Sequence, residues 1–248
     1  MAPPTTGAAA TGRRYFHVAV AVVMLALTIA GFHPYYTRGV GEGGRIIDRS
    51  LVTLVAAHGT LATAWFVLFL VQAALVPTGR RRVHMKLGWG AAAVGLGVAV
   101  SGTLLALASV RITPPSFQFF GVAYKEFLLV MFTEMAAFTA LLIAGLLWRR
   151  KPERHRAMML LASLSILAGA TSRMPVFFPV YGHAVIPGLF GPIFTLGLIV
   201  VAARTWLNSR LDLWLTGGYL ALVVVYVGAS TLAVSEWWNG VLQSAFRL

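Results

Sequence analysis

Residues 51–76 read LVTLVAAHGTLATAWFVLFLVQAALV, an apolar stretch that no charged side chain interrupts. An α-helix rises about 1.5 Å per residue and the hydrocarbon core of a bilayer is about 30 Å thick, so about 20 such residues cross it. A helix also satisfies its own backbone hydrogen bonds, which is required in lipid. The stretch is therefore predicted to span a membrane as one helix.

Stretches of the same kind recur along the whole chain. We expect spans at residues 15–32, 51–76, 87–110, 119–148, 155–172, 186–205 and 213–237. The fourth is too long for a straight crossing, so its start is expected to lie along the membrane interface. Pro187 and Pro192 should kink the sixth span or mark its start. The sequence predicts an all-α, polytopic transmembrane bundle of about seven spans, or six if one segment re-enters.

Composition supports one membrane domain. Hydrophobic residues make up 58% of the 248 residues and charged residues 11%, against about 25% charged in soluble domains. A soluble core of this size could not bury so much apolar surface. Residues 1–14 are expected to form a mobile tail and residues 15–248 the transmembrane domain. Cysteine is absent, which excludes disulfides, iron–sulfur clusters and covalently attached haem.

The net charge of +13 is distributed in a way that predicts orientation. Thirteen of the 20 Lys and Arg residues lie at the N-terminus and in alternate loops: Arg13, Arg14, Arg80, Arg81, Arg82, Lys86, Arg149, Arg150, Lys151, Arg154, Arg156, Arg204 and Arg210. The positive-inside rule then places the N-terminus in the cytoplasm and, with seven spans, the C-terminus in the periplasm of a bacterial inner membrane. Nucleic acid is not an expected partner, because the basic clusters lack interleaved aromatic residues.

His84 and His155 are the most suggestive pair. Each lies in a basic turn just before a span, and antiparallel alternation places both at one membrane depth. Two neutral imidazoles that face each other are able to ligate a b-type haem, with nearby arginines on its propionates. The alternative is that both are interfacial histidines with a buried ring and a solvated tip.

Two helix faces carry further signals. His58, Trp65 and Gln72 recur at seven-residue intervals and so share one face of the second span, either as a packing stripe or with His58 as a haem ligand or proton carrier. The third span carries a face of small residues: Gly88, Ala92, Gly95, Ala99, Gly102 and Ala106. Such a face allows either close helix packing or room for a flat macrocycle.

Glu134 lies deep in an apolar helix, and an intramembrane carboxyl group is a functional-site hypothesis by default. Arg173 is a candidate partner for Glu134 or for an anionic head group. Lys125 and Glu126 lie nearer the interface, where they could neutralise each other. On the outer side we expect a group that forms either a structural ion pair or a proton or quinone site: His33, His58, Glu126, Glu134, Arg173 and His183.

The chain resembles a family of uncharacterised bacterial inner-membrane proteins. The residues that carry this resemblance are His58, Trp65, Gln72, His84, Leu87, Gly88, Pro152, Glu153, His155, Arg156 and Arg173, between about residues 51 and 173. The family brings no established activity. The element from His84 to Gly88 also resembles helix starts of transmembrane b-type cytochromes, whose ligands come as two pairs on four consecutive helices. The fourth span here has no histidine, so this resemblance implies at most one haem.

These observations favour a membrane redox protein. It would hold one haem b through His84 and His155, or use His58, and exchange electrons with a quinone or a respiratory or photosynthetic partner complex. The second hypothesis is a cofactor-free accessory or structural subunit that packs on a larger membrane complex through the glycine face of the third span. The third is a proton-coupled carrier centred on Glu134.

Overall fold

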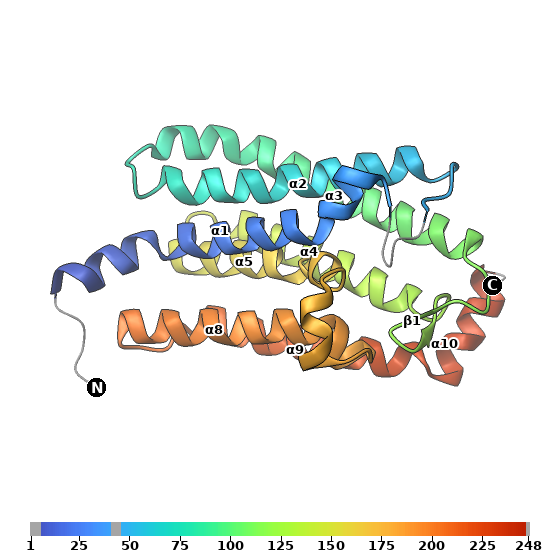
Figure 1. Cartoon of the computed structure of the whole chain (residues 1–248). Helices are drawn as coiled ribbons and strands as arrows, with labels where there is room; N and C mark the ends of the chain where they lie inside the picture. The colour runs from blue at the N-terminus through green and yellow to red at the C-terminus, as the bar shows by residue number, and fades with distance from the viewer. Residues whose placement is uncertain (1–5, 41–45, 247–248) are drawn as a thin grey trace.

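The computed structural model describes residues 6–40 and 46–246, and most of them are helical (Figure 1). Six helices are long and apolar enough to cross a membrane, and a seventh crossing is present if one sharply bent pair counts as a span. The long helices are α1 Thr6–Arg38, α2 Val52–Leu75, α3 Arg81–Ile112, α4 Leu128–Leu147, α8 Gly191–Asn208 and α9 Leu213–Ala233. The predicted all-α bundle of about seven spans is confirmed.

The bent pair is the predicted fifth span. It consists of α5 Pro152–Ser165 and α6 Ala168–Thr171, followed by a 3-10 turn, Pro175–Phe177, and α7 Phe178–Tyr181. The chain bends by 94° between residues 152–171 and residues 175–181. Proline disfavours helical backbone at the residue before it, and Met174 is accordingly extended before Pro175. The chain therefore leaves the direction of α5 and α6 after about residue 172.

Other ends differ from the predicted spans. The fourth span starts at Leu128 and not at residue 119, because β1 Gln118–Phe119 and β2 Val122–Ala123 form a hairpin before it. Phe120 and Gly121, which connect the strands, both have positive φ angles, as a tight two-residue hairpin turn requires. α1 already begins at Thr6, so residues 6–14 are helical; the rest of the expected mobile tail lies outside the described residues.

The predicted effect of the prolines on the sixth span is confirmed. A π-helical turn, Val185–Phe190, contains Pro187 and leads into α8, which has Pro192 in its first turn. The final span, α9, is followed by α10 Glu236–Val241 and a second π-helical turn, Leu242–Phe246. Proline fits the first turn of a helix because its missing N–H has no intrahelical acceptor there.

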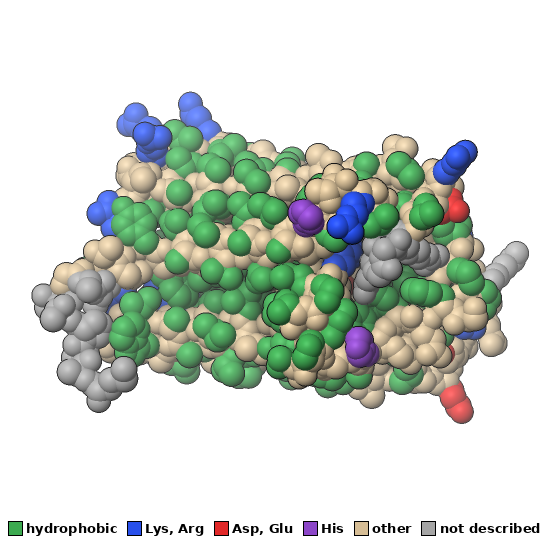
Figure 2. All heavy atoms as spheres, viewed as in Figure 1, with side chains coloured by type: hydrophobic (Ala, Val, Ile, Leu, Met, Phe, Trp, Pro, Cys, Tyr) green, Lys and Arg blue, Asp and Glu red, His purple; other side chains and the backbone are tan. Residues whose placement is uncertain are grey.

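The core of the bundle is centred on two aromatic residues. α2 packs on α3, α3 on α4 and α4 on α5, while α1 covers α2, and α9 covers α4 and α5. The rings of Trp65 and Phe138 meet edge to face at 5.1 Å, and Trp65 Nε1 donates a hydrogen bond to Ser163 Oγ at 3.2 Å. Large apolar side chains also cover the outside, as lipid contact requires (Figure 2).

Basic side chains gather at one end of the bundle, which we call the basic end (Figure 2). It contains the connections at residues 76–80, 148–151 and 209–212; the opposite end contains residues 113–127 and 172–184. The chain is a multi-pass membrane protein by the length and composition of its helices. The cytoplasmic location of the basic end stays a prediction.

Candidate functional site

The two histidines of the predicted pair meet at the basic end. His84 lies in the first turn of α3 and His155 in the first turn of α5, and both helices start at this end. Their ring centroids are 6.2 Å apart and their ring planes are nearly perpendicular, at 88°. Both side chains are half-buried. His84 and His155 are thus close together although they are far apart in the sequence, and both lie where a helix starts at the same end.

Hydrogen bonds to the main chain select the tautomer of each ring. His84 Nδ1 lies 3.2 Å from the carbonyl oxygen of Gln72, and His155 Nδ1 lies 2.8 Å from that of Gly145. A carbonyl oxygen only accepts, so Nδ1 must carry the proton in both rings. Nε2 of each neutral imidazole then holds a lone pair, as in metal-ligating histidines whose other nitrogen is bonded to a carbonyl.

Gln72 adds a further acceptor to this cluster. Its side-chain Oε1 is buried and has no hydrogen-bond partner among the described residues, while its main-chain oxygen faces His84. A side chain at Gly88 would lie 3.6 Å from Gln72 Nε2. The cluster therefore contains the buried Oε1 of Gln72, which has no donor among the described residues, and the Nε2 atoms of the two rings, each with a lone pair. All three atoms are able to accept a hydrogen bond or to bind an electrophile.

The basic end also holds residues that the sequence reading did not single out. His17 in α1 interacts electrostatically with His155, Arg156 and Arg204. In the sequence, His17 follows Arg14 by three residues at the start of a span. This position indicates that His17 lies at the same membrane depth as His84 and His155. The three histidines lie on α1, α3 and α5, so three separate helices present imidazoles to this region.

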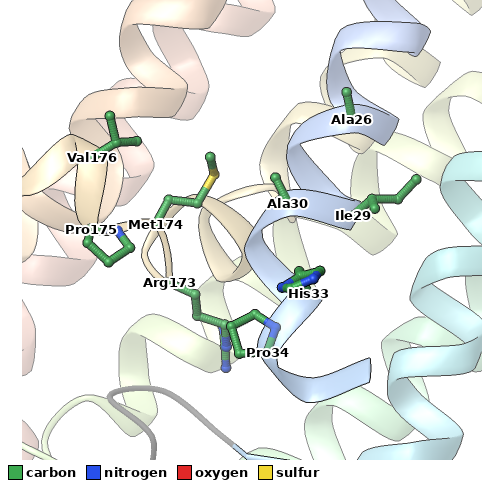
Figure 3. Close-up of a pocket in the computed structure, with 9 residues that line it drawn as sticks. All are labelled: Ala26, Ile29, Ala30, His33, Pro34, Arg173, Met174, Pro175 and Val176. Atoms are coloured by element: carbon green, nitrogen blue, oxygen red, sulfur yellow. The ribbon is translucent and has the colours of Figure 1, made fainter. Parts of the chain in front are cut away.

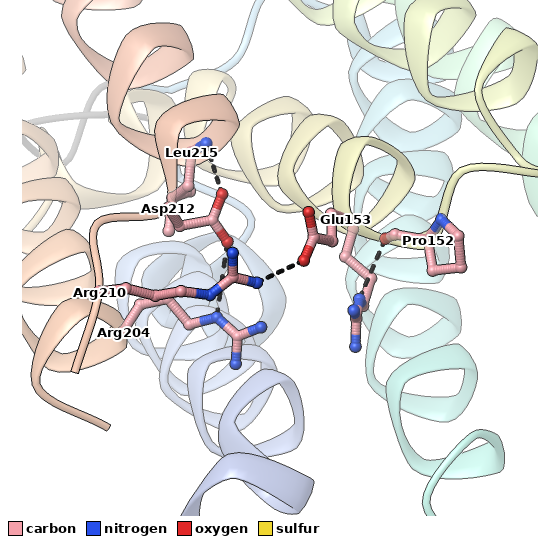
Figure 4. Close-up of polar contacts among 7 residues, drawn as sticks. Pro152, Glu153, Arg204, Arg210, Asp212 and Leu215 are labelled. Carbon is pink, nitrogen blue, oxygen red and sulfur yellow. Dashed lines mark hydrogen bonds and ion pairs between the residues drawn. The ribbon is translucent and has the colours of Figure 1, made fainter. Parts of the chain in front are cut away.

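Acidic groups at the basic end are already engaged (Figure 4). Arg204 Nε lies 3.6 Å from Asp212 Oδ2, and Arg210 Nη2 lies 2.5 Å from Glu153 Oε1. Asp212 also caps α9 by accepting from the Leu215 amide at 3.2 Å. Within the described part of the chain, no carboxylate lies within ion-pair distance of Arg156, which leaves this cation beside the histidines for an external anion.

A second polar cluster lies towards the opposite end. Glu134 in α4 is 9% exposed, and its Oε1 has no hydrogen-bond partner in the described regions. It interacts electrostatically with Arg173, at the end of the broken span, and with Tyr226 in α9. Tyr226 was not predicted; its hydroxyl donates to the Ser165 carbonyl at 2.7 Å, where α5 breaks.

His58 and Arg173 belong to this second cluster. His58 Nδ1 lies 3.0 Å from Ser101 Oγ, whose own proton goes to Gly97 O, and His58 interacts electrostatically with Arg173. Arg173 Nη1 donates to the Gly169 carbonyl, and the guanidinium lies over the Phe32 ring, 4.9 Å from its centroid. No carboxylate of the described chain lies within 4.0 Å of Arg173, so Glu134 influences it from a greater distance.

Other predicted members of the outer group are placed separately. His33 lines a groove together with Arg173. His183 is exposed, contacts the Phe178 ring in a tilted arrangement with centroids 4.7 Å apart, and lines a different pocket. Lys125 and Glu126 lie in the turn before α4 and form no ion pair with each other. The two are therefore outside the fourth span in which Lys125 was expected.

The glycine face of α3 is covered by side chains of the same chain. A Cβ atom at Gly95 would lie 2.7 Å from Leu142 and 2.9 Å from Trp65, and one at Gly102 would lie 3.0 Å from His58. Close helix packing is thus the role of these two positions. The residues spaced seven apart on α2 take part in the same helix packing, since Trp65 faces Gly95 and His58 faces Gly102 of α3.

Comparisons add no relative: no family model, no curated protein and no solved structure matches this chain. Within residues 6–40 and 46–246, no group of three His, Asp or Glu side chains is placed to hold a metal ion. A haem differs from such a site because its iron needs only one or two axial ligands from the protein.

Proposed function

We propose that the protein is a membrane redox protein that binds one b-type haem between His84 and His155. The observation that carries this proposal is the pair of imidazoles 6.2 Å apart, each bonded through Nδ1 to a carbonyl. Imidazole nitrogens lie about 2 Å from a bound metal, so two rings that share one ion have centroids about 6 Å apart. The donor set and its spacing therefore fit two axial ligands.

The surrounding residues have complementary roles in this proposal. Hydrogen bonds from Nδ1 to the Gln72 and Gly145 carbonyls hold each ring in the ligand tautomer and make Nε2 more basic. Arg156, which has no carboxylate partner in the described chain, would pair with a propionate. Bound haem supplies one-electron transfer, and a quinone or a protein complex in the inner membrane is the proposed partner.

Absorption spectroscopy tests the haem. We expect detergent-purified protein from haem-supplemented cells to give a b-type spectrum on dithionite reduction, with about one haem per chain by pyridine haemochrome. His84→Ala and His155→Ala should each lower the haem content and lose the six-coordinate b-type spectrum, because one of the two axial imidazoles is removed. His183→Ala, a histidine variant outside the pair, should keep it. A colourless wild-type protein, or unchanged haem content in both pair variants, would refute the assignment.

A proton-coupled carrier centred on Glu134 is the second candidate. The specific observation is a buried carboxyl with an unpartnered oxygen beside Arg173 and the broken fifth span. Glu134→Gln removes the titrating group at constant size, so proton movement coupled to solute uptake in proteoliposomes should stop. Unchanged coupling in this variant would remove the candidate.

An accessory subunit has less support. The glycine face expected to dock on a partner complex is filled by Trp65, Leu142 and His58 of the chain itself. Such a subunit would have to use another of the apolar outer faces.

A further inference from the structure

A groove lies between α1 and the break in the fifth span (Figure 3). One wall is α1 between Ala26 and Pro34, and the other is the break between Arg173 and Val176; the volume is about 630 Å³. α1 and α6 are in close contact beside the groove, because Gly31 lies directly against the Ala170 main chain. The groove therefore runs alongside this contact.

The charge among the lining residues of the groove is positive. Among the described residues that line it, only Arg173 and His33 have polar side chains, and the others are apolar. One guanidinium nitrogen of Arg173 donates to Gly169, and no carboxylate of the described chain lies within 4.0 Å to compensate the charge. The His33 side chain is exposed and has no hydrogen bond among the described contacts. A cation that no described carboxylate contacts, between apolar walls, is stabilised by an anion from outside the chain.

The position in the bundle indicates what kind of anion fits. The groove lies on the outside of the bundle. α1 ends at Arg38, four residues or about 6 Å beyond Pro34. Arg173 and His33 are therefore near the head-group region, while Ile29 and Val176, 51% and 67% exposed, present apolar surface towards lipid chains. Guanidinium groups bind phosphate oxygens through two parallel hydrogen bonds.

We propose that this groove is a binding site for an anionic phospholipid, with its phosphate on Arg173 and His33 and an acyl chain along Ile29 and Val176. The apolar walls favour a lipid over a free phosphate ion, since seven of the nine lining residues offer no polar side chain. A bound lipid would contact both α1 and the broken span. The site is at the opposite end from the histidine pair and does not depend on haem.

Thermal unfolding of delipidated protein with added lipid tests this site. We expect dioleoylphosphatidylglycerol to raise the melting temperature of the wild type, whereas dioleoylphosphatidylcholine and inorganic phosphate do not. Arg173→Gln should weaken the apparent affinity for the anionic lipid by about tenfold or more, as loss of a charged hydrogen-bond donor implies. Arg111→Gln is the matched control: an exposed arginine at the same end, on α3, that should keep the full response.

A second variant keeps the test decisive if Arg173→Gln does not fold. Ala30→Phe fills the groove while retaining Arg173, so the lipid response should be lost although the charge remains. The proposal is overturned if Ala30→Phe or a folded Arg173→Gln responds like the wild type. It is also overturned if phosphatidylcholine or inorganic phosphate reproduces the full shift. Haem content, measured in parallel, reports separately on the redox proposal.

Discussion

Gly31→Ala should destabilise the protein more than any other single methyl group added to a glycine of a span. A Cβ atom at Gly31 would lie 2.7 Å from the carbonyl carbon of Ala170 and closer still to its oxygen. Both are main-chain atoms of α6 and have no rotamer to change. α1 and α6 must therefore move apart, which also enlarges the neighbouring groove.

The expected magnitude combines two opposing effects. Overpacking of a tight contact costs about 1–3 kcal/mol and sometimes more. Replacing glycine by alanine within a helix stabilises the folded protein by about 0.5–1 kcal/mol, because the unfolded chain has less conformational freedom to lose. We expect a net loss of about 2 kcal/mol in the free energy of unfolding. Gly90→Ala, on an exposed face of α3 with no neighbour within 4 Å, should show only the small gain.

Reversible unfolding in mixed detergent and SDS micelles, followed by circular dichroism, measures both variants under one condition. Gly145→Ala gives an intermediate case, because its Cβ would meet Met159 Sδ at 2.6 Å, the flexible part of a side chain. The expected order of stability is Gly90→Ala, then Gly145→Ala, then Gly31→Ala. Equal stability of Gly31→Ala and Gly90→Ala would refute the close contact between α1 and α6.

Two further substitutions probe the interior. Trp65→Phe removes the hydrogen bond to Ser163 and part of the contact with Phe138, and should cost about 2 kcal/mol in the same unfolding assay; a loss below about 0.5 kcal/mol would show that this core is loosely packed. Glu134→Gln should change the unfolding free energy by less than about 1 kcal/mol, because Oε1 has no hydrogen bond to lose. A loss of about 3–5 kcal/mol would instead reveal a tight buried ion pair with Arg173.

The spans were predictable because lipid imposes one requirement on every crossing segment, namely a long run of apolar residues. The common depth of His84 and His155 was predictable, since both lie in first turns at the same end. Their ring separation of 6.2 Å was not, because it depends on how the helices pack and are rotated about their axes. Hydropathy does not locate helix breaks of this kind: the 94° bend lies between residues 171 and 175, and Pro175, which disfavours helical backbone at Met174, lies beyond the predicted span.

The contacts of the second cluster were less accessible from the sequence. Glu134, Arg173 and Tyr226 interact electrostatically because of how α4, the end of α6 and α9 are placed and rotated, and rotation depends on packing with neighbouring helices. Tyr226 gives no distinct signal in an apolar helix, because tyrosine is common near membrane surfaces. The hairpin before α4 was missed for a related reason: residues 118–123 are as apolar as a span.

The aromatic core at Trp65 and Phe138 has an electrical consequence. These rings fill the interior between the two polar clusters, and a medium of packed hydrocarbon has a low dielectric constant. A transmembrane voltage is worth about 2.3 kcal/mol per charge per 100 mV, and most of it falls across the least polarisable layer. A charge that enters or leaves at His84 and His155 would cross little of that voltage, whereas one that passed between Glu134 and the histidine pair would cross most of it.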